Sequence, residues 1–305
     1  MSAFSVVGAG RLGTSLARAL TRRGWGLEAL VDRDPAAARE ARRIVGRGHA
    51  GTDIRLAAAR GAGVVFVCVP DDAVETVARA LARSGADWAG RTVFHTSGLL
   101  PSAALEPLRR RGARVASLHP VRSFPERTGG PRLFRGIVWA VEGDADAVRL
   151  GARIARSLGG RPIRLSVEAK PLYHAACCVA SNFLVALEAA AAGLLSEAGV
   201  GRATAARALF PLIQGTLRNV KELGWTKALT GPLARGDVRT VRRHLEALAG
   251  RPLADGIYRA LARQALALVE PGKVPAANIR ALRRSLGGKR PPLRGARRTS
   301  RRPAP

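Results

Sequence analysis

A glycine-rich segment near the start of the chain has the residue types and the spacing of a phosphate-binding turn. Residues 7–13 read VGAGRLG, after an apolar run typical of a buried strand and before a segment with apolar residues at helical spacing. In this context the first glycine permits a tight turn, the second lets a pyrophosphate approach the backbone, and the third lets helix and strand pack closely. Because free N–H groups at a helix start bind phosphate, we expect a dinucleotide to contact Gly8, Gly10, Arg11, Leu12 and Gly13.

A carboxylate follows the second apolar run, residues 27–31, at the position expected for ribose recognition. Asp32 lies 19 residues after Gly13, close to the spacing of roughly 20 residues in dinucleotide-binding folds. A carboxylate there favours a free 2′-hydroxyl group and hence NAD, whereas the next residue, Arg33, is of a type that binds a 2′-phosphate. The sequence therefore predicts a nicotinamide dinucleotide held by Asp32 and Arg33, with NAD and NADP both open. Pro70, after a later strand, completes the expected cofactor-binding set.

Three further polar clusters fall where predicted strands end. They occupy residues 70–72, 95–98 and 117–124. Ligands of open parallel sheets bind beyond the carboxyl ends of the strands, so side chains from these clusters are expected to meet at one edge. We therefore expect His95, Ser97 and His119 to line a substrate pocket there.

The first lysine of the chain is Lys170, which follows a long stretch whose strongly basic side chains are all arginine. An amine, unlike a guanidinium group, can lose its proton at ordinary pH. Helical spacing places four polar residues on one stripe of an otherwise apolar helix: Lys170, His174, Cys177 and Ser181. Such a stripe must face water, a ligand or a partner. We expect Lys170 or His174 to act as general acid or base, and the neighbouring Asn182 to line the pocket.

A loop between two predicted helices, residues 226–237, combines hydroxyl groups, glycine and arginine. Thr230 and Arg235 are the types of residue that hold a substrate carboxylate. The alternative is a plain turn in which Asp237 caps the following helix. Both interpretations stay open at this point.

The elements that must position these residues alternate in the first half of the chain. Apolar runs typical of strands lie at residues 3–7, 27–31, 64–69, 92–95, 114–118, 137–141 and 163–165, and helices are expected between several of them, at 71–83, from about 101, and at 145–158. Apolar strands separated by helices predict a parallel-rich sheet that is covered on both faces.

The pattern changes near residue 166, after which only helical periodicity occurs, up to residue 286. The predicted fold class is therefore an α/β Rossmann domain, with a parallel-rich doubly wound sheet, followed by an all-α domain. We expect the NAD(P)-binding domain at residues 1–165, a helical substrate and dimerisation domain at 166–286, and a basic disordered tail at 287–305.

The composition sets limits on partners and compartment. The net charge of +29 comes with 47% hydrophobic residues, which fits a globular enzyme. The cations are almost all arginine, and eleven of them lie after Glu270 without any acid, so we expect a solvated tail and no specific nucleic acid partner. Cys68, Cys177 and Cys178 lack disulfide or metal spacing, and the first strand leaves no room for a signal peptide. These observations predict a cytoplasmic protein without a metal.

One apolar stretch, residues 172–195, is long enough to span a bilayer. It carries His174, Asn182 and Glu188, however, and such residues are rare inside membranes. We therefore interpret it as a buried core helix or a dimer-interface helix, and predict a homodimer with no membrane partner.

Several of these segments together resemble a known family. They are residues 7–13, 95–98, His119-Pro120 with Phe124, Lys170 with His174 and Asn182, and residues 228–237 with His244. They are similar to the Rossmann-like oxidoreductases with a C-terminal domain of unknown function 2520, a branch of the 6-phosphogluconate dehydrogenase-like superfamily. The resemblance covers about residues 3–270.

The resemblance implies a reaction class rather than a substrate. Related families include ketopantoate reductase, pyrroline-5-carboxylate reductase and the 3-hydroxyisobutyrate dehydrogenases. In the hydroxyacid members a lysine on the first helix of the C-terminal domain is the general acid or base, with an asparagine four residues later. Lys170 matches that lysine, whereas His174 stands in place of the asparagine and leaves the proton donor open.

The residues and the resemblance together predict an NAD(P)-dependent oxidoreductase acting on a carbonyl or imine carbon of a small molecule. Two other classes of function remain as alternatives. One is a dinucleotide-binding sensor without turnover, and the other is a nucleic-acid-associated protein that uses the arginine-rich tail.

Overall fold

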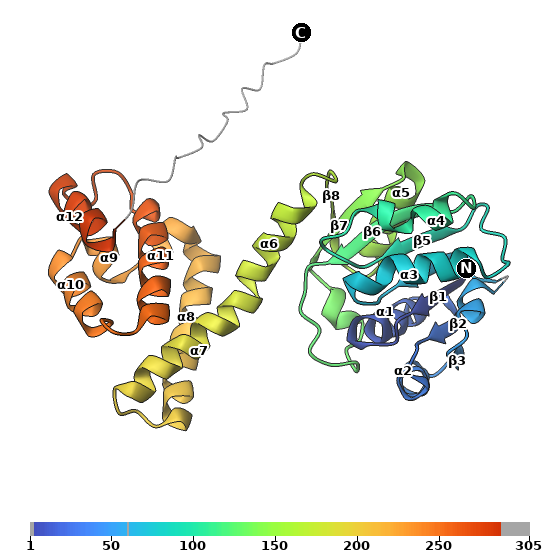
Figure 1. Cartoon of the computed structure of the whole chain (residues 1–305), viewed down its shortest axis with the longest axis horizontal. Coiled ribbons are helices and arrows are strands. Elements are labelled where there is room, and N and C mark those ends of the chain that lie inside the picture. The colour runs from blue at the N-terminus through green and yellow to red at the C-terminus, as the bar shows by residue number, and fades with distance from the viewer. Residues whose placement is uncertain (1–2, 60, 288–305) are drawn as a thin grey trace, which may run out of the picture. The chain divides into compact units, whose positions relative to one another are not determined.

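The computed structural model describes residues 3–59 and 61–287, and they form two units, Met1–Phe183 and Leu184–Pro305. Eight strands form one sheet in the first unit, in the order β3-β2-β1-β4-β5-β6-β7-β8 (Figure 1). Neighbouring strands are parallel except β6 and β7. The strands are β1 (Ala3–Val7), β2 (Gly26–Val31), β3 (His49–Gly51), β4 (Val64–Val67), β5 (Thr92–His95), β6 (Arg114–Pro120), β7 (Val138–Gly143) and β8 (Arg161–Arg164).

Helices cover both faces of this sheet, which is why its strands are apolar on both sides. One face packs on α1 (Arg11–Arg22) and α5 (Ala145–Ser157). The other packs on α3 (Asp71–Ala82), the 3-10 helix η2 (Ser102–Leu105) and the short helix α4 (Glu106–Arg109). Two further 3-10 helices, η1 (Ile54–Ala58) and η3 (Pro131–Phe134), lie in connections. The predicted doubly wound, parallel-rich sheet is confirmed.

Three details of the first unit differ from the predictions. The helix expected from about residue 101 is replaced by η2 and the four-residue α4, after which Gly112, at φ 90°, turns the chain. Strand β4 ends at Val67 rather than at residue 69. Strand β3 and helix α2 (Pro35–Val45) were not predicted.

The register of strands β5, β6 and β7 places three polar residues side by side. Ser117 of β6 lies opposite His95 of β5 on one side and opposite Glu142 of β7 on the other. Directly opposed residues project from the same face of a sheet, so these three polar side chains form one row across three strands. This face is the one that carries α3 and α4.

The second unit is helical throughout its described residues. Its helices are α7 (Asn182–Glu197), α8 (Arg202–Ala228), α9 (Gly231–Arg235), α10 (Val238–Ala247), α11 (Pro252–Leu268) and α12 (Ala276–Leu286), with α7 beginning two residues before the division. A small core joins α10, α11 and α12 through Val241, Ala262, Leu266, Leu282 and Leu286. The predicted all-α region is therefore confirmed, while the tail lies outside the described residues apart from Gly287.

The long apolar helix predicted at residues 172–195 is two helices. Helix α6 (Lys170–Ala180) ends at Ser181, whose φ of −122° and ψ of −70° break the helix before α7. Lys170–Glu197, 28 residues long, has the length and apolar composition of a membrane span, and its most apolar 18-residue window has a mean hydropathy of 1.8, but none of that window is buried within the chain. The buried-core interpretation is therefore wrong for the single chain, and the interface interpretation remains a prediction.

Candidate functional site

The three glycines of the β1–α1 turn have three different surroundings. Gly8 has a φ of +96°, and a Cβ atom on it would overlap the carbonyl oxygen of Cys68. A Cβ on Gly13 would overlap the carbonyl oxygen of Gly8. A Cβ on Gly10, in contrast, would meet no atom within 4 Å. The turn thus packs closely on the segment after β4 at Gly8 and on the start of α1 at Gly13, and has open space at Gly10, which fits a pyrophosphate.

The start of α1 is free to bind an anion. Gly10 is the N-cap residue and offers no side-chain cap, and the first turn contains no acid. The first N–H groups of a helix have no acceptor within the helix, and they carry its positive dipole end. Thr14 steadies this turn, because its buried hydroxyl donates to the carbonyl oxygen of Ala9 at 3.0 Å.

Asp32, which directly follows β2, fixes the glycine turn through a hydrogen bond. Its Oδ2 accepts the N–H of Ala9 at 2.7 Å, and its Oδ1 accepts the N–H of Asp34 at 3.0 Å. Arg33 between them is exposed. Pro70, the N-cap residue of α3, is also exposed. This geometry is compatible with a ribose hydroxyl group bound to Asp32, as in NAD, and with a 2′-phosphate bound to Arg33, as in NADP.

Lys170 is almost completely buried, with 1% of its surface exposed. Its Nζ donates to Ser117 Oγ at 2.7 Å, and Ser117 in turn donates to the carbonyl oxygen of Ser97 at 3.1 Å. Burial lowers the pKa of Lys170, because the charged form loses hydration, while the carboxylates of Glu142 and Asp71 raise it in part. The result is an amine that loses its proton more readily than a surface lysine.

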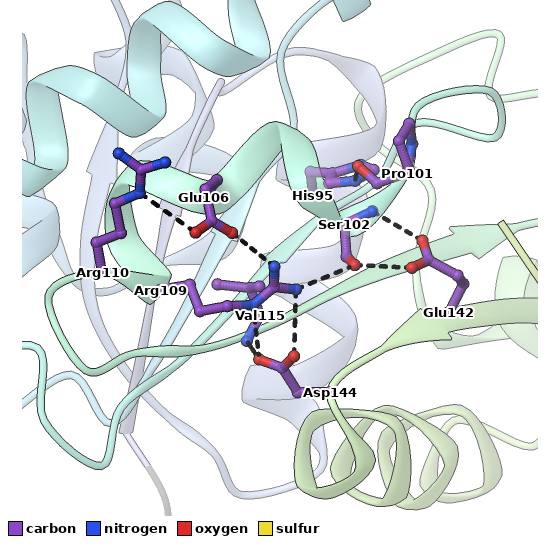
Figure 2. A network of polar contacts seen from close by, with 9 residues as sticks. All are labelled: His95, Pro101, Ser102, Glu106, Arg109, Arg110, Val115, Glu142 and Asp144. Atoms are coloured by element: carbon purple, nitrogen blue, oxygen red, sulfur yellow. Dashed lines mark hydrogen bonds and ion pairs between the residues drawn. The ribbon is translucent and has the colours of Figure 1, made fainter.

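Glu142 is a buried carboxylate that a hydrogen-bond network fixes in place (Figure 2). It accepts the backbone N–H of Ser102 and the hydroxyl group of Ser102, both at 2.7 Å. Arg109 extends the network from Ser102 to Asp144 and Glu106. The two hydrogen bonds from Ser102 hold the carboxylate in place, and its charge raises the pKa of Lys170 in part.

His95 is fully buried, and both of its ring nitrogens are occupied. Nδ1 accepts the N–H of Ser97 at 3.2 Å, and Nε2 lies 3.1 Å from the carbonyl oxygen of Pro101. Burial first, and then the charge of Lys170, lower its pKa to about 4. Nδ1 as acceptor places the proton on Nε2. His95 therefore holds the turn after β5 and does not line the cavity described next.

A cavity of about 440 Å³ lies between the loop after β6 and the end of α6. It brings together three of the expected site residues, His119, His174 and Asn182. Its other lining residues are Val121, Arg122, Ser123, Cys177, Cys178, Ala180 and Ser181. No carboxylate lines this cavity.

The two histidines of the cavity lie against Gly98. Their ring centroids are 6.3 Å apart. A Cβ on Gly98 would lie 2.7 Å from His174 Cδ2 and 3.1 Å from His119 Nε2. His119 is also bonded to Tyr173, whose hydroxyl oxygen lies 2.6 Å from His119 Nδ1. Only glycine leaves room at position 98 for both rings.

Ser97 supports this edge of the sheet rather than entering the cavity. Its hydroxyl group donates to Asp71 Oδ2 at 2.8 Å and accepts the N–H groups of Leu99 and Leu100 at 3.1 and 2.9 Å. The side chain is 6% exposed. Ser97 therefore ties the end of β5 to the start of α3.

The remaining expected residues, Thr230 and Arg235, lie in the second unit. Thr230 is the N-cap residue of α9 without a side-chain bond, and Arg235 is exposed. Asp237 caps α10, accepting the N–H of Thr240 at 3.0 Å, which confirms the capping interpretation. The three cysteines are free, and no metal-binding group of three or more His, Cys, Asp or Glu occurs in residues 3–59 and 61–287.

Sequence reasoning missed the residues that support Lys170 and His119. Ser117 begins the polar cluster 117–124 and follows two apolar residues of its strand, and Glu142 follows another apolar run at once. A buried polar residue in a strand needs a partner, and this was the available signal. Tyr173, three residues after Lys170, lies in a helix, where its sequence position does not indicate a contact with His119.

Comparison with known proteins agrees with this geometry. Residues 2–120 match the Rossmann-like domain, and residues 137–265 match the domain of unknown function 2520. No curated protein matches the chain.

Solved structures of similar fold cover nearly all of the described chain. A Bacteroides fragilis protein assigned as an NADP oxidoreductase is 26% identical, with a TM-score of 0.70 over 87% of this chain and 98% of that one. A Thermotoga maritima protein is 28% identical, with a TM-score of 0.67 over 87% and 98%. A pyrroline-5-carboxylate reductase from Coxiella burnetii, at 18% identity and a TM-score of 0.54 over 88% and 99%, shares the fold alone.

Proposed function

Because the chain belongs to the Rossmann-like oxidoreductases with a C-terminal domain of unknown function 2520, we propose that it transfers a hydride between the nicotinamide of NAD(P) and a carbonyl or imine carbon of a small substrate. The observation that carries this proposal is the buried amine of Lys170, bonded to Ser117. Ser117 lies in the middle of β6, opposite His95 at the carboxyl end of β5, on the sheet whose β1–α1 turn fits a pyrophosphate.

The bound dinucleotide supplies the hydride, and the chain supplies binding and the proton. Gly8, Gly10 and Gly13 shape the turn, and the start of α1 binds the pyrophosphate. Lys170 or His174 gives a proton to the substrate oxygen or nitrogen as the bond to hydrogen forms at carbon. Ser117 positions the amine of Lys170, because its hydroxyl accepts from Nζ while donating to the backbone.

The first test is a fluorescence titration of the purified chain with NADH and, separately, with NADPH. Saturable binding supports the proposal, and the tighter ligand shows whether Asp32 or Arg33 dominates ribose recognition. A screen of 2-oxo acids and cyclic imines then follows the oxidation of the bound cofactor. Binding without turnover of any compound favours a sensor, and absence of binding by a folded sample contradicts the proposal.

Glu142→Gln should shift the pH profile of reduction toward lower pH. The general acid must be protonated, so the rate falls as pH rises through its pKa. Removing the Glu142 carboxylate removes a charge that raises the pKa of Lys170, so this fall begins at a lower pH. The measurement is kcat/KM against pH, with the exposed Glu75→Gln as the matched control. An unshifted profile would remove Lys170 as the proton donor and leave His174.

We also propose that the protein is a homodimer, assembled through the helical unit. The described helices of that unit leave many large apolar side chains exposed: Val185, Phe210, Leu212, Leu217, Leu223, Trp225, Leu253 and Leu261. Helix α7 has no buried residue, and α8 has only Ala205. Exposed apolar surface of this extent marks an interaction site, and a second copy presents the same surface. Thr230 and Arg235 would then serve a site of the dimer.

Phe210→Glu should convert the dimer into a monomer. Burying a phenylalanine contributes about 2 kcal/mol, and twofold symmetry uses it twice, so the dimer dissociation constant should rise at least about a hundredfold. Analytical ultracentrifugation measures this constant, with the exposed Arg239→Glu on α10 as control. A wild-type monomer in solution would overturn the dimer, and a requirement for detergent would favour a membrane partner.

We place the protein in the cytoplasm, with a small-molecule substrate and no specific nucleic acid or membrane partner. Three free cysteines fit a reducing compartment. Cell fractionation with an antibody against the chain tests this placement.

A further inference from the structure

His119 in the cavity wall is paired with Tyr173, and this pair has no role in the mechanism given so far. Tyr173 lies on α6, and His119 lies near the end of β6. The tyrosine oxygen and His119 Nδ1 are 2.6 Å apart, and the rings meet edge to face, with centroids 5.7 Å apart and planes at 87°. This short contact fixes the orientation of the imidazole ring.

Both partners are neutral near pH 7. Burial raises the pKa of Tyr173 above its usual range, and burial together with the charges of His174 and Lys170 lowers the pKa of His119 to about 4. The titratable groups that face His119 are His95 on β5 and Lys170, Tyr173 and His174 on α6. None of these groups is a carboxylate, so nothing at close range favours the imidazolium form.

The direction of the hydrogen bond decides where the single imidazole proton resides. The hydroxyl group of Tyr173 has one hydrogen-bond partner among the described residues, His119 Nδ1, and the thiol of Cys177 is close enough to raise the pKa of the tyrosine. A thiol sulfur is a weak acceptor, and an unprotonated imidazole nitrogen is a stronger one. The phenol therefore donates to Nδ1, and the proton of the neutral ring lies on Nε2.

The Nε2–H group of His119 has no hydrogen-bond partner among residues 3–59 and 61–287, since the contact of this ring is made through Nδ1. It lies beside Gly98, where a Cβ would come within 3.1 Å, and the ring lines the cavity together with His174. An N–H group without a partner of its own, on an imidazole ring that lines a cavity and is held in place by its other nitrogen, is available to a ligand.

We propose that His119 is a catalytic residue, whose Nε2–H donates a hydrogen bond to the reacting oxygen or nitrogen of the substrate, and that Tyr173 is the positioning residue that keeps the proton on Nε2. This inference rests on the proposed oxidoreductase function. Hydride adds to the carbon, the π pair of the C=O or C=N bond moves to the heteroatom, and the heteroatom takes its proton from Lys170 or His174. His119 keeps its own proton and stabilises the developing charge.

The first part of the test needs no substrate. Long-range proton–nitrogen correlation spectra of the uniformly ¹⁵N-labelled full chain report the tautomer of each histidine, and His119→Gln identifies the signals of His119. At pH 7 we expect Nε2 protonated and Nδ1 unprotonated, with the Nδ1-protonated tautomer becoming populated in Tyr173→Phe. A wild-type ring protonated on Nδ1 or on both nitrogens would overturn the inference, as would signals that Tyr173→Phe leaves unchanged.

The second part compares two substitutions with the compound reduced in the screen described above. Glutamine places an amide N–H near the position of Nε2, whereas leucine offers none. We expect His119→Gln to keep kcat within about tenfold of the wild type and His119→Leu to lose at least about a hundredfold, the usual cost of one such donor. Equal losses in both variants would overturn the inference. NADPH titration of the same samples separates this result from failure of the proposed function, which appears as absence of cofactor binding by the wild type.

Discussion

Replacing Lys170 with methionine should lower kcat by about 10²- to 10⁴-fold, the usual contribution of a positioned general acid or base. Methionine retains an unbranched apolar chain but has no proton to give. It also leaves the buried Glu142 carboxylate without the nearby cation, so we expect a lower midpoint of thermal unfolding in a chain that still folds. The measurements are steady-state kinetics and thermal unfolding, with the exposed Lys227→Met as the control.

The same variant separates chemistry from cofactor binding. Lys170 bonds to Ser117, whereas the pyrophosphate site is built from the β1–α1 turn. The dissociation constant for NADPH should therefore stay within about twofold of the wild-type value, a difference of about 0.4 kcal/mol. Unchanged turnover would remove Lys170 from the mechanism and leave His174 as the proton donor. Loss of NADPH binding together with turnover would show that Lys170 acts on the cofactor.

Most of the sheet was predictable because its strands are buried on both faces. Continuous apolar runs such as residues 64–67 and 138–141 indicate a buried strand without any knowledge of its neighbours. Strand β3 has only three residues, two of them part-buried and one exposed, so its pairing with β2 decides its conformation. Helix α2 did carry local signals, with Asp34 as N-cap, Gly46 as C-cap and a buried face that includes Ala37, Ala38 and Ala41, so the sequence was sufficient to predict it.

The site was predictable in its residue types but not in its contacts. Strand ends place His95, Ser97 and His119 at one edge, as the alternation of strands and helices requires. The bond from Lys170 to Ser117, and the position of Glu142 opposite Ser117, depend on the antiparallel register of β6 and β7. Register follows from pairing over the whole sheet, so the residues near Lys170 in sequence could not reveal it.

Gly10→Ala should leave the fold intact and weaken dinucleotide binding by at least about tenfold. The backbone at Gly10 has a φ of −73°, which alanine adopts without strain, and the added Cβ meets no atom of the chain within 4 Å. The loss of a glycine N-cap costs less than about 1 kcal/mol. The methyl group instead occupies the open space that fits a pyrophosphate, and losing one charge-assisted hydrogen bond there costs about 1.5–3 kcal/mol. NADPH titration and thermal unfolding measure the two effects.

Gly13→Ala is the matched contrast, because it should damage the fold itself. Its Cβ overlaps the carbonyl oxygen of Gly8, so helix α1 has to move away from β1, at a cost of about 1–3 kcal/mol. We therefore expect a lower midpoint of thermal unfolding for Gly13→Ala and an unchanged midpoint for Gly10→Ala. If Gly10→Ala binds NADPH as tightly as the wild type, the pyrophosphate does not lie at this turn, and the dinucleotide site must be sought elsewhere. If both variants unfold alike, the turn is a structural feature alone.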